Sequence, residues 1–186
     1  MFRELLTREF APYGSLNPAQ LEQLESHYKL LLRWNAKLNL TRIDSLEKAT
    51  RLHYCESMLL GQRLPTGPLR IVDIGSGAGF PGIPIAILRP ECDITLVESH
   101  KRKSVFLNET VRNLVNAKVV TDRAENLKDK FDWLVSRAVS PGDVSKLNLA
   151  NNLAMLVGAI DAKAFHNSEL LPWGENRYMV FHVKHP

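Results

Sequence analysis

The segment that most constrains this chain is Ile71 to Gly82, which reads IVDIGSGAGFPG. A short, mainly apolar run ends at Asp73 and Ile74, and a cluster of glycines follows. These glycines are Gly75, Gly77, Gly79 and Gly82. Glycine adopts backbone conformations that other residues avoid, and it lets a ligand come close to the main chain. We therefore expect a strand-to-helix turn that binds a ligand, as in doubly wound α/β folds.

Turns of this kind bind two classes of cofactor, dinucleotides and S-adenosylmethionine. The spacing of Gly77, Gly79 and Gly82 satisfies the dinucleotide pattern GxGxxG, which is a weak signal by itself. A carboxylate at Asp73 would repel a pyrophosphate, but it would attract the ammonium and sulfonium groups of S-adenosylmethionine. Glu98 ends the next predicted strand, where an acid can accept hydrogen bonds from both ribose hydroxyls. The two acids favour S-adenosylmethionine, and a glycine turn that serves packing alone is the remaining alternative.

The first 60 residues show helical patterns. Asn17 followed by Pro18 is typical of a helix start, with an N-cap residue before a proline in the first turn. Asp44 and Glu47 have the spacing of a capping box and predict a second helix. We expect that helix to end at Gly61.

The pattern changes after residues 64–68, which contain two prolines and a glycine. We therefore divide the chain into a helical extension, residues 1–62, and a cofactor-binding core, residues 63–186. Predicted strands in the core are residues 69–74, 94–97, 117–120, 131–136, 153–157 and 178–183, and predicted helices are 80–88 and 101–116. Alternation of strands and helices predicts an α/β fold with a doubly wound, mostly parallel sheet.

The composition fits one globular domain, with 45% hydrophobic and 24% charged residues. A net charge of +4 permits a nucleic-acid partner without demonstrating one. Cys55 and Cys92 show neither disulfide nor metal-ligand spacing. The N-terminus lacks the pattern of a signal peptide, and no apolar run is long enough to span a membrane. We expect a cytoplasmic monomer that binds no metal and no membrane.

The residues after the fourth predicted strand bear on the atom that is methylated. Enzymes that methylate exocyclic amines often carry (Asp/Asn)-Pro-Pro-aromatic here, whereas this chain has Ser136 to Val139. Cytosine-C5 enzymes need a thiolate, and Cys92 lies in a turn on the wrong side of the first core helix. Guanine N7 has an in-plane lone pair and no proton, so its methylation needs positioning and charge stabilisation but no general base.

With these motifs in place, the chain resembles the RsmG family, the bacterial small-subunit ribosomal RNA guanine-N7 methyltransferases. The segments that carry the resemblance are Trp34–Asn35, Asn39–Thr41, His53 with Glu56–Ser57, Asp73–Pro84, Glu98–Ser99, Arg102–Lys103 with Phe106–Leu107, Arg123–Glu125, Ser136–Ala138 and Asn176–Lys184. The resemblance implies a class I methyltransferase fold, which is Rossmann-like, with an N-terminal helical extension. It also implies a guanosine of 16S rRNA as the target.

The resemblance implies cofactor contacts at Gly75, Phe80, Ala124, Glu125 and Arg137. The loop that contains Ala124 and Glu125 could equally be a solvated charged turn. Arg137 ends a central strand and faces the crevice, so we predict that it contacts the cofactor and orients the base or a phosphate. A structural ion pair is the alternative for Arg137.

Basic residues could form a track for RNA. They are Arg33, Lys37, Arg42, Arg51, Lys101, Arg102 and Lys103. A solvated surface is the competing interpretation for each of them. Trp34 and His53 are interpreted as residues of apolar helix faces rather than as RNA-stacking groups.

The sequence is also compatible with two other functions. One is a methyltransferase for a small molecule or a protein, and the other is a cofactor-binding regulatory or assembly protein with little activity. The stretch from Ser140 to Pro172 looks short compared with the RsmG family, and we expect the helix after the fifth strand to be abbreviated.

Overall fold

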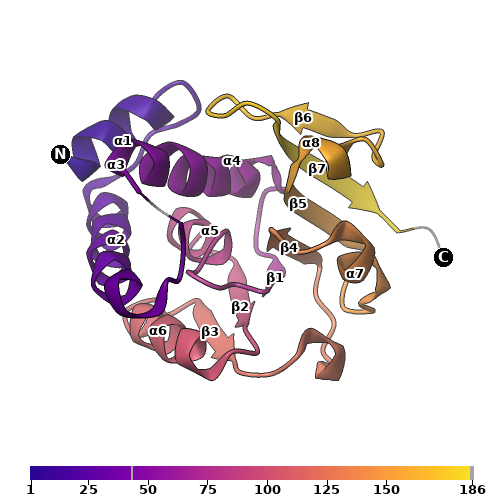
Figure 1. Cartoon of the computed structure of the whole chain (residues 1–186). Coiled ribbons are helices and arrows are strands. Elements are labelled where there is room, and N and C mark those ends of the chain that lie inside the picture. Colours follow the sequence, from indigo (N-terminus) through magenta and orange to yellow (C-terminus); the bar gives the residue numbers. More distant parts are fainter. Residues whose placement is uncertain (43, 185–186) are drawn as a thin grey trace.

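A seven-stranded sheet forms the centre of the computed structural model, which describes residues 1–42 and 44–184. The strand order is β3-β2-β1-β4-β5-β7-β6 (Figure 1). The strands are β1 (Arg70–Ile74), β2 (Asp93–Val97), β3 (Ala117–Val120), β4 (Trp133–Arg137), β5 (Asn152–Gly158), β6 (Ser168–Leu170) and β7 (Arg177–Val183). Strands β1 to β5 run parallel to one another, and β7 is antiparallel to both its neighbours. The predicted mostly parallel α/β sheet is confirmed.

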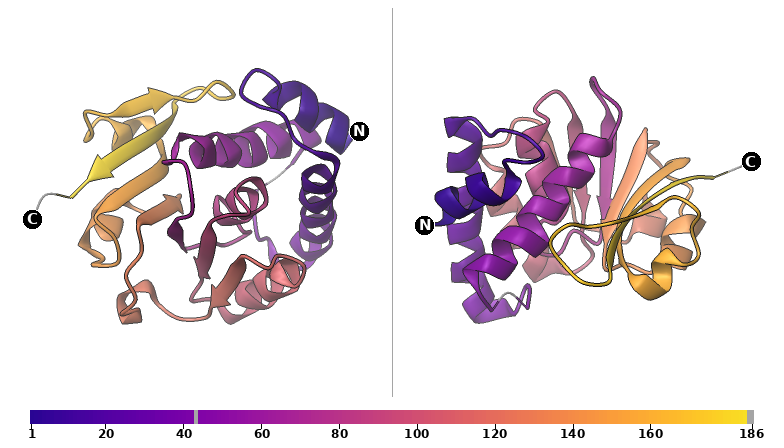
Figure 2. Two further views of the ribbon diagram at one scale, coloured as in Figure 1. Left: turned by 180° about the vertical axis from the view of Figure 1, so that it is seen from behind. Right: turned by 90° about the horizontal axis from the view of Figure 1, so that it is seen from above.

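Helices cover both faces of the sheet, but unevenly (Figure 2). The helical segments are α1 (Phe2–Phe10), α2 (Pro18–Leu38), α3 (Leu46–Lys48), the π-helix η1 (Ala49–Cys55), α4 (Glu56–Arg63), α5 (Gly82–Leu88), α6 (Lys101–Val111), the 3₁₀-helix η2 (Ala124–Asn126), α7 (Pro141–Lys146) and α8 (Ala159–Ala162). Ile71 of β1 belongs to a hydrophobic cluster with residues of the N-terminal helices, α5 and α6, whereas its neighbour Val72 belongs to a second cluster with residues of α7 and α8. Successive strand residues thus supply two separate hydrophobic cores.

The start of α2 follows the local sequence. The Asn17 side chain accepts a hydrogen bond from the backbone N–H of Gln20 at 2.9 Å, and the Gln20 side chain accepts one from Asn17 N–H. Pro18 occupies the first turn, where its missing N–H costs nothing. The predicted helix start is confirmed.

The second predicted helix differs from the expectation at both ends. Its N-cap is Ser45, whose hydroxyl accepts from Lys48 N–H, while Asp44 pairs with the Lys48 ammonium at 2.6 Å. The helix passes Gly61 and ends at Arg63. Gly61 serves packing, because a Cβ there would lie 3.2 Å from Ile85 Cγ1 of α5. The glycine therefore lets two helices approach and does not end one.

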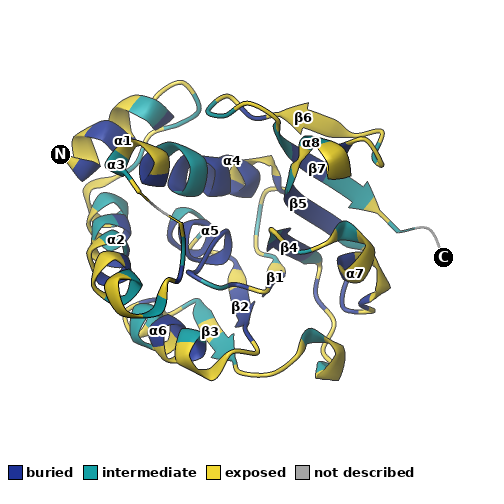
Figure 3. Cartoon of the chain, in the orientation of Figure 1, coloured by how far each residue is buried: buried dark blue, intermediate teal, exposed yellow. Residues whose placement is uncertain are grey.

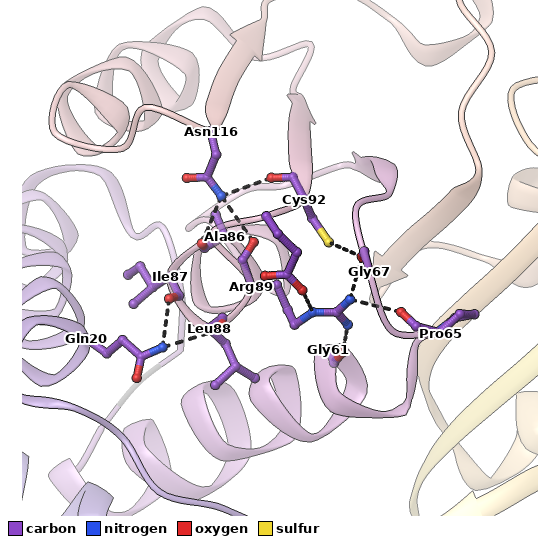
Figure 4. A network of polar contacts seen from close by, with 11 residues as sticks. Gln20, Gly61, Pro65, Gly67, Ala86, Ile87, Leu88, Arg89, Cys92 and Asn116 are labelled. Atoms are coloured by element: carbon purple, nitrogen blue, oxygen red, sulfur yellow. Dashed lines mark hydrogen bonds and ion pairs between the residues drawn. The ribbon is translucent and has the colours of Figure 1, made fainter.

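Helix α5 is buried almost throughout, between α4, α2 and the sheet (Figure 3). It begins at Gly82 rather than at the predicted residue 80. Helix α6 ends at Val111, short of the predicted residue 116. Asn116 leaves the helix because its side-chain amide donates to the carbonyls of Ala86 and Cys92, both at 3.0 Å (Figure 4).

The predicted boundary, residues 64–68, is held by Arg89. Its guanidinium donates to the carbonyls of Gly61 at 3.0 Å and of Pro65 and Gly67 at 2.9 Å (Figure 4). One hydrophobic cluster also runs from Phe2 and Leu6 into the sheet. The division at residue 62 stays a prediction about organisation.

Three elements escaped the sequence patterns: η2, α7 and β6. Helix α8 has only four residues, which agrees with an abbreviated helix after β5. Strand β6 has three residues, all exposed, so no apolar alternation marks it. Among the helices of the described residues, none is long and apolar enough to cross a membrane.

Candidate functional site

The glycine-rich turn joins the carboxyl end of β1 to the start of α5. Gly75, Gly77 and Gly79 have φ values of 68°, 55° and 88°, in the left-handed region that other residues rarely adopt. Gly75 is exposed and Gly77 is half-buried, so their backbone can meet a ligand. Gly79 is buried, and a Cβ there would lie 2.7 Å from Ile83 Cγ1. Packing thus explains Gly79, whose predicted cofactor contact stays a prediction.

Asp73 is fully buried at the end of β1. Its Oδ2 accepts a hydrogen bond from Gly82 N–H at 2.9 Å. Its Oδ1 has no donor among the described residues. Burial raises the pKa of this carboxyl to about 7, against the lowering effect of the hydrogen bond from Gly82 N–H. The site therefore holds a carboxylate with one oxygen in need of a donor.

Glu98 closes β2 beside the same turn. Its Oε2 accepts from Gly77 N–H at 3.0 Å, and its Oε1 accepts from His100 N–H at 2.8 Å. The side chain is almost fully buried. Glu98 thus ties the glycine-rich turn to the neighbouring strand end, and its oxygens keep further lone pairs for another donor.

The loop after β3 lies at the same edge of the sheet, because β1, β2 and β3 are parallel neighbours. Asp122 Oδ1 accepts from Arg123 N–H and from the Asn126 amide, both at 2.7 Å. Ala124 is half-buried and Glu125 is exposed. Their cofactor contact stays a prediction.

Arg137 forms an ion pair with Glu56, which was the alternative to a cofactor contact at this position. Its Nη1 donates to the carbonyl of Leu52 and lies 3.4 Å from Glu56 Oε2. Burial lowers the pKa of Arg137 to about 10, and Glu56 opposes that shift. Glu56 also accepts from Nε and Nη2 of Arg177, both at 2.5 Å. Glu56 and Arg177 both lie in segments that carry the family resemblance, but the sequence assigned neither a role in the site, because 121 residues separate them.

Phe80 lies in the core rather than at an open surface. Its side chain is buried, and its ring centroid is 5.0 Å from those of His53 and Tyr54 and 5.3 Å from that of His27. Its predicted cofactor contact stays a prediction. The interpretation of His53 as an apolar-face residue agrees with this aromatic packing.

A histidine that the sequence did not single out supports the glycine-rich turn. His27 Nε2 lies 3.1 Å from the carbonyl oxygen of Ala78, and its Nδ1 lies 2.8 Å from the Tyr54 hydroxyl. The carbonyl only accepts, so Nε2 carries the proton and Tyr54 donates to Nδ1. Burial lowers the pKa of His27 to about 4, which keeps the ring neutral at pH 7. The helical extension thus holds the turn directly.

The residues of the predicted basic track lie on several elements, and their contact with RNA stays a prediction. Arg33 and Lys37 lie on α2, Arg42 follows it, and residues 101–103 open α6. Arg51 pairs with Glu9 at 3.0 Å, so it is engaged in a structural contact. Trp34 donates to Glu109 at 2.9 Å and packs against Phe106, which confirms its structural interpretation.

Comparisons with known proteins agree with this architecture. The family model described as rRNA small subunit methyltransferase G matches residues 20–160. The chain belongs to the rRNA small subunit methyltransferase G family. A relative of that name from Dichelobacter nodosus is 43% identical over 142 residues, which cover 74% of this chain and 67% of the relative. Relatives of the same name from Lachnoclostridium phytofermentans and Chromobacterium violaceum are 39% and 41% identical, each over 67% of this chain.

The chain spans 55% and 61% of the length of the last two relatives. Solved structures show the same fold at low identity. A SAM dependent methyltransferase from Aquifex aeolicus has a TM-score of 0.59 at 12% identity, over 78% of this chain and 96% of its own. A SAM-dependent O-methyltransferase from Thermotoga maritima has a TM-score of 0.54 at 14% identity, over 83% of this chain and 71% of its own. The rRNA small subunit methyltransferase G family member described here therefore has the class I methyltransferase fold.

Proposed function

We propose that this protein binds S-adenosylmethionine and methylates N7 of a guanosine in the 16S rRNA of the small ribosomal subunit. The observation that carries the proposal is the glycine-rich turn with Asp73 and Glu98 at the ends of two adjacent parallel strands. Membership of the family supports the substrate class. We further propose that the protein acts in the cytoplasm as a monomer.

The residues of this turn fit the cofactor. The buried Asp73 Oδ1 lacks a hydrogen-bond donor, and an ammonium group would supply one. Glu98 retains acceptor capacity for the ribose hydroxyls. Gly75 and Gly77 present backbone without side chains. A Cβ at Gly75 would lie 2.9 Å from Val139 Cγ2, so a larger residue would close the space between the two loops.

The chain's own contribution to the reaction is orientation and charge. The bound cofactor supplies a methyl group made electrophilic by its sulfonium. Guanine N7 has a lone pair and carries no proton, so its methylation would require no residue of this chain to remove one. Asp73 and Glu98 hold the cofactor, and Arg137 positions the nucleotide, so no residue is needed as a general base.

The proposal is tested with 16S rRNA or small subunits from cells that lack the modification. The protein and labelled cofactor are added, the RNA is digested, and the nucleosides are identified by mass spectrometry. Formation of 7-methylguanosine is expected. Cofactor binding without methyl transfer would instead favour a regulatory or assembly role, and transfer only to other molecules would favour a non-RNA substrate.

The role of Glu98 is tested by Glu98→Ala. Loss of charge-assisted hydrogen bonds to the ribose should weaken cofactor binding at least about tenfold. Titration calorimetry with S-adenosylhomocysteine measures the affinity. Asp129→Ala is the matched control. Asp129 is an exposed acid shortly before the amino end of β4, whereas the turn follows the carboxyl end of the parallel strand β1. Equal affinity in Glu98→Ala and the control would remove Glu98 from the cofactor site.

A further inference from the structure

A cavity of about 360 Å³ lies at the carboxyl ends of β4 and β5. We call it the arginine cavity. Its lining includes His53, Arg137, Val139, Gly158, Asp161 and Arg177. Val139 also borders Gly75 of the glycine-rich turn, as the 2.9 Å approach of a Cβ at Gly75 shows. The arginine cavity therefore adjoins the proposed cofactor site.

The two guanidinium groups of the arginine cavity have only one carboxylate as an ion-pair partner among the described residues. Two guanidinium groups, those of Arg137 and Arg177, share the single carboxylate of Glu56, which is fully buried. Asp161 lies at the rim, is exposed, and makes no ion pair with either arginine in the described part of the chain. Placing two largely buried cations beside one fully buried anion is costly unless a further anion joins them.

Several hydrogen-bonding groups in this lining lack partners. Glu56 and Leu52 engage only Nη1 of Arg137, and Glu56 engages Nε and Nη2 of Arg177. Nε and Nη2 of Arg137 and Nη1 of Arg177 thus have no hydrogen-bond partner within residues 1–42 and 44–184. His53 Nδ1 is buried and also has none. Burial and the two arginines lower the pKa of His53 to about 2, so the ring adds a hydrogen-bonding group without a charge.

We propose that the arginine cavity binds a phosphate group of the RNA strand beside the target guanosine. A phosphate offers several acceptor oxygens and negative charge, which match the free guanidinium N–H groups of two arginines that share one carboxylate. The cavity's position beside Gly75 places that phosphate next to the point of methyl transfer. This proposal rests on the proposed function and assigns Arg177 and His53 to substrate positioning. The carboxylate of the cofactor has similar chemistry, and the experiments separate the two sources.

The first test places a charge in the arginine cavity without disturbing Glu56. Gly158 lines the cavity, and a Cβ there would meet no atom within 4 Å. It is also the N-cap of α8, with φ −82° and ψ 170°, a position that Asp and Asn both favour. Gly158→Asp adds a carboxylate, and Gly158→Asn is the neutral control of the same shape.

The readout is equilibrium binding of an unmodified 16S rRNA transcript at several KCl concentrations, with S-adenosylhomocysteine saturating. Gly158→Asp should bind the RNA about tenfold more weakly than Gly158→Asn, because its carboxylate repels the phosphate. The two variants should bind S-adenosylhomocysteine equally. Equal RNA affinities would overturn the proposal, and a difference confined to the cofactor would assign the cavity to the cofactor carboxylate.

The second test removes a phosphate ligand. Arg177→Gln leaves Glu56 paired with Arg137, and Arg63→Gln is the control, because Arg63 pairs with Glu169 outside the cavity. Arg177→Gln should lower the slope of log affinity against log salt by about one, while Arg63→Gln preserves it. Arg177→Lys should restore the slope, because it restores the charge. An unchanged slope in folded Arg177→Gln protein would contradict the proposal.

These binding measurements do not depend on methyl transfer. RNA binding with the expected differences but without 7-methylguanosine would refute the proposed function and support the phosphate site. If the protein forms 7-methylguanosine but Gly158→Asp and Arg177→Gln bind RNA with wild-type affinity, the proposed function is supported and the phosphate site is refuted.

Discussion

At the scale of single residues, Asp73 illustrates how position changes the chemistry of a side chain. The sequence marks it as a cofactor acid because it precedes the glycines. In the fold it is fully buried and also holds the start of α5 through Gly82 N–H. One carboxylate therefore serves both the local structure and the proposed site, and these two roles give separate measurable effects.

The raised pKa of Asp73 predicts a pH dependence of stability. In the folded state this pKa is about 7, above the ordinary 3.8, so the folded protein retains a proton that the unfolded chain releases between these values. The contribution of Asp73 to the free energy of unfolding therefore falls as pH rises from about 4 to about 7, at up to about 1.4 kcal/mol per pH unit.

Urea denaturation of the cofactor-free protein between pH 5 and pH 8 measures this dependence. Asp73→Asn should flatten it. Asp44→Asn is the control, because Lys48 lowers the pKa of the exposed Asp44 and moves its contribution below this range. If the free energy of unfolding depends on pH in the same way for wild type and Asp73→Asn, Asp73 does not titrate between pH 5 and pH 8.

His27 is the second residue whose role depends on burial. His27→Leu should lower the free energy of unfolding by about 2 to 4 kcal/mol, because it leaves the Tyr54 hydroxyl and the Ala78 carbonyl without partners. Tyr54→Phe should cost about 1 kcal/mol, since only one hydrogen bond is lost. Tyr28→Phe is the control, as its hydroxyl has no hydrogen bond among the described side chains. If neither variant lowers the free energy of unfolding by more than Tyr28→Phe does, the hydrogen bonds of His27 to Tyr54 and Ala78 do not stabilise the fold.

At the scale of elements, local signals and tertiary packing decide different boundaries. The Asn17 cap acts within one turn, so the start of α2 could be predicted from sequence. Gly61 resembles a helix end in sequence, yet the proximity of Ile85 explains why it is glycine. The π-helix η1 joins α3 to α4 and turns Tyr54 and Glu56 into the interior, which no regular helical period predicts.

The start of α5 gives a prediction at this scale. Gly82→Ala should lower the free energy of unfolding by about 1 to 3 kcal/mol, because the added Cβ would lie 2.6 Å from Asp73 Oδ2 and would crowd Leu96. Gly158→Ala is the matched control, since its Cβ meets nothing within 4 Å. Thermal or urea denaturation compares the two. Equal stabilities would mean that α5 shifts freely to accommodate the methyl group.

At the scale of the whole molecule, the helical extension and the sheet share one hydrophobic cluster. Phe10 of α1, Leu31 of α2 and Ile83 of α5 are all fully buried within it. Figure 2 shows these helices along one face of the sheet. Because each part buries the apolar surface of the other, separation would expose both.

We therefore expect the two predicted parts to unfold in one cooperative transition. Variants that retain a single tryptophan, either Trp34 in α2 or Trp133 in β4, report on the two parts by fluorescence. Their urea midpoints should coincide with each other and with the loss of helical circular dichroism. Separate midpoints would show that residues 1–62 form an independent unit.

The sequence by itself determined the sheet except for β6, the glycine-rich turn and the family, because apolar runs, glycine spacing and short motifs are local patterns. It also placed Asp73 and Glu98 at adjacent strand ends, since parallel strands bring their carboxyl ends together. Only the tertiary structure decided the partners of Arg137, the support that His27 gives the turn, and the arginine cavity. Those features join residues that lie 51 to 121 positions apart, and side-chain packing brings them together without a trace in local sequence.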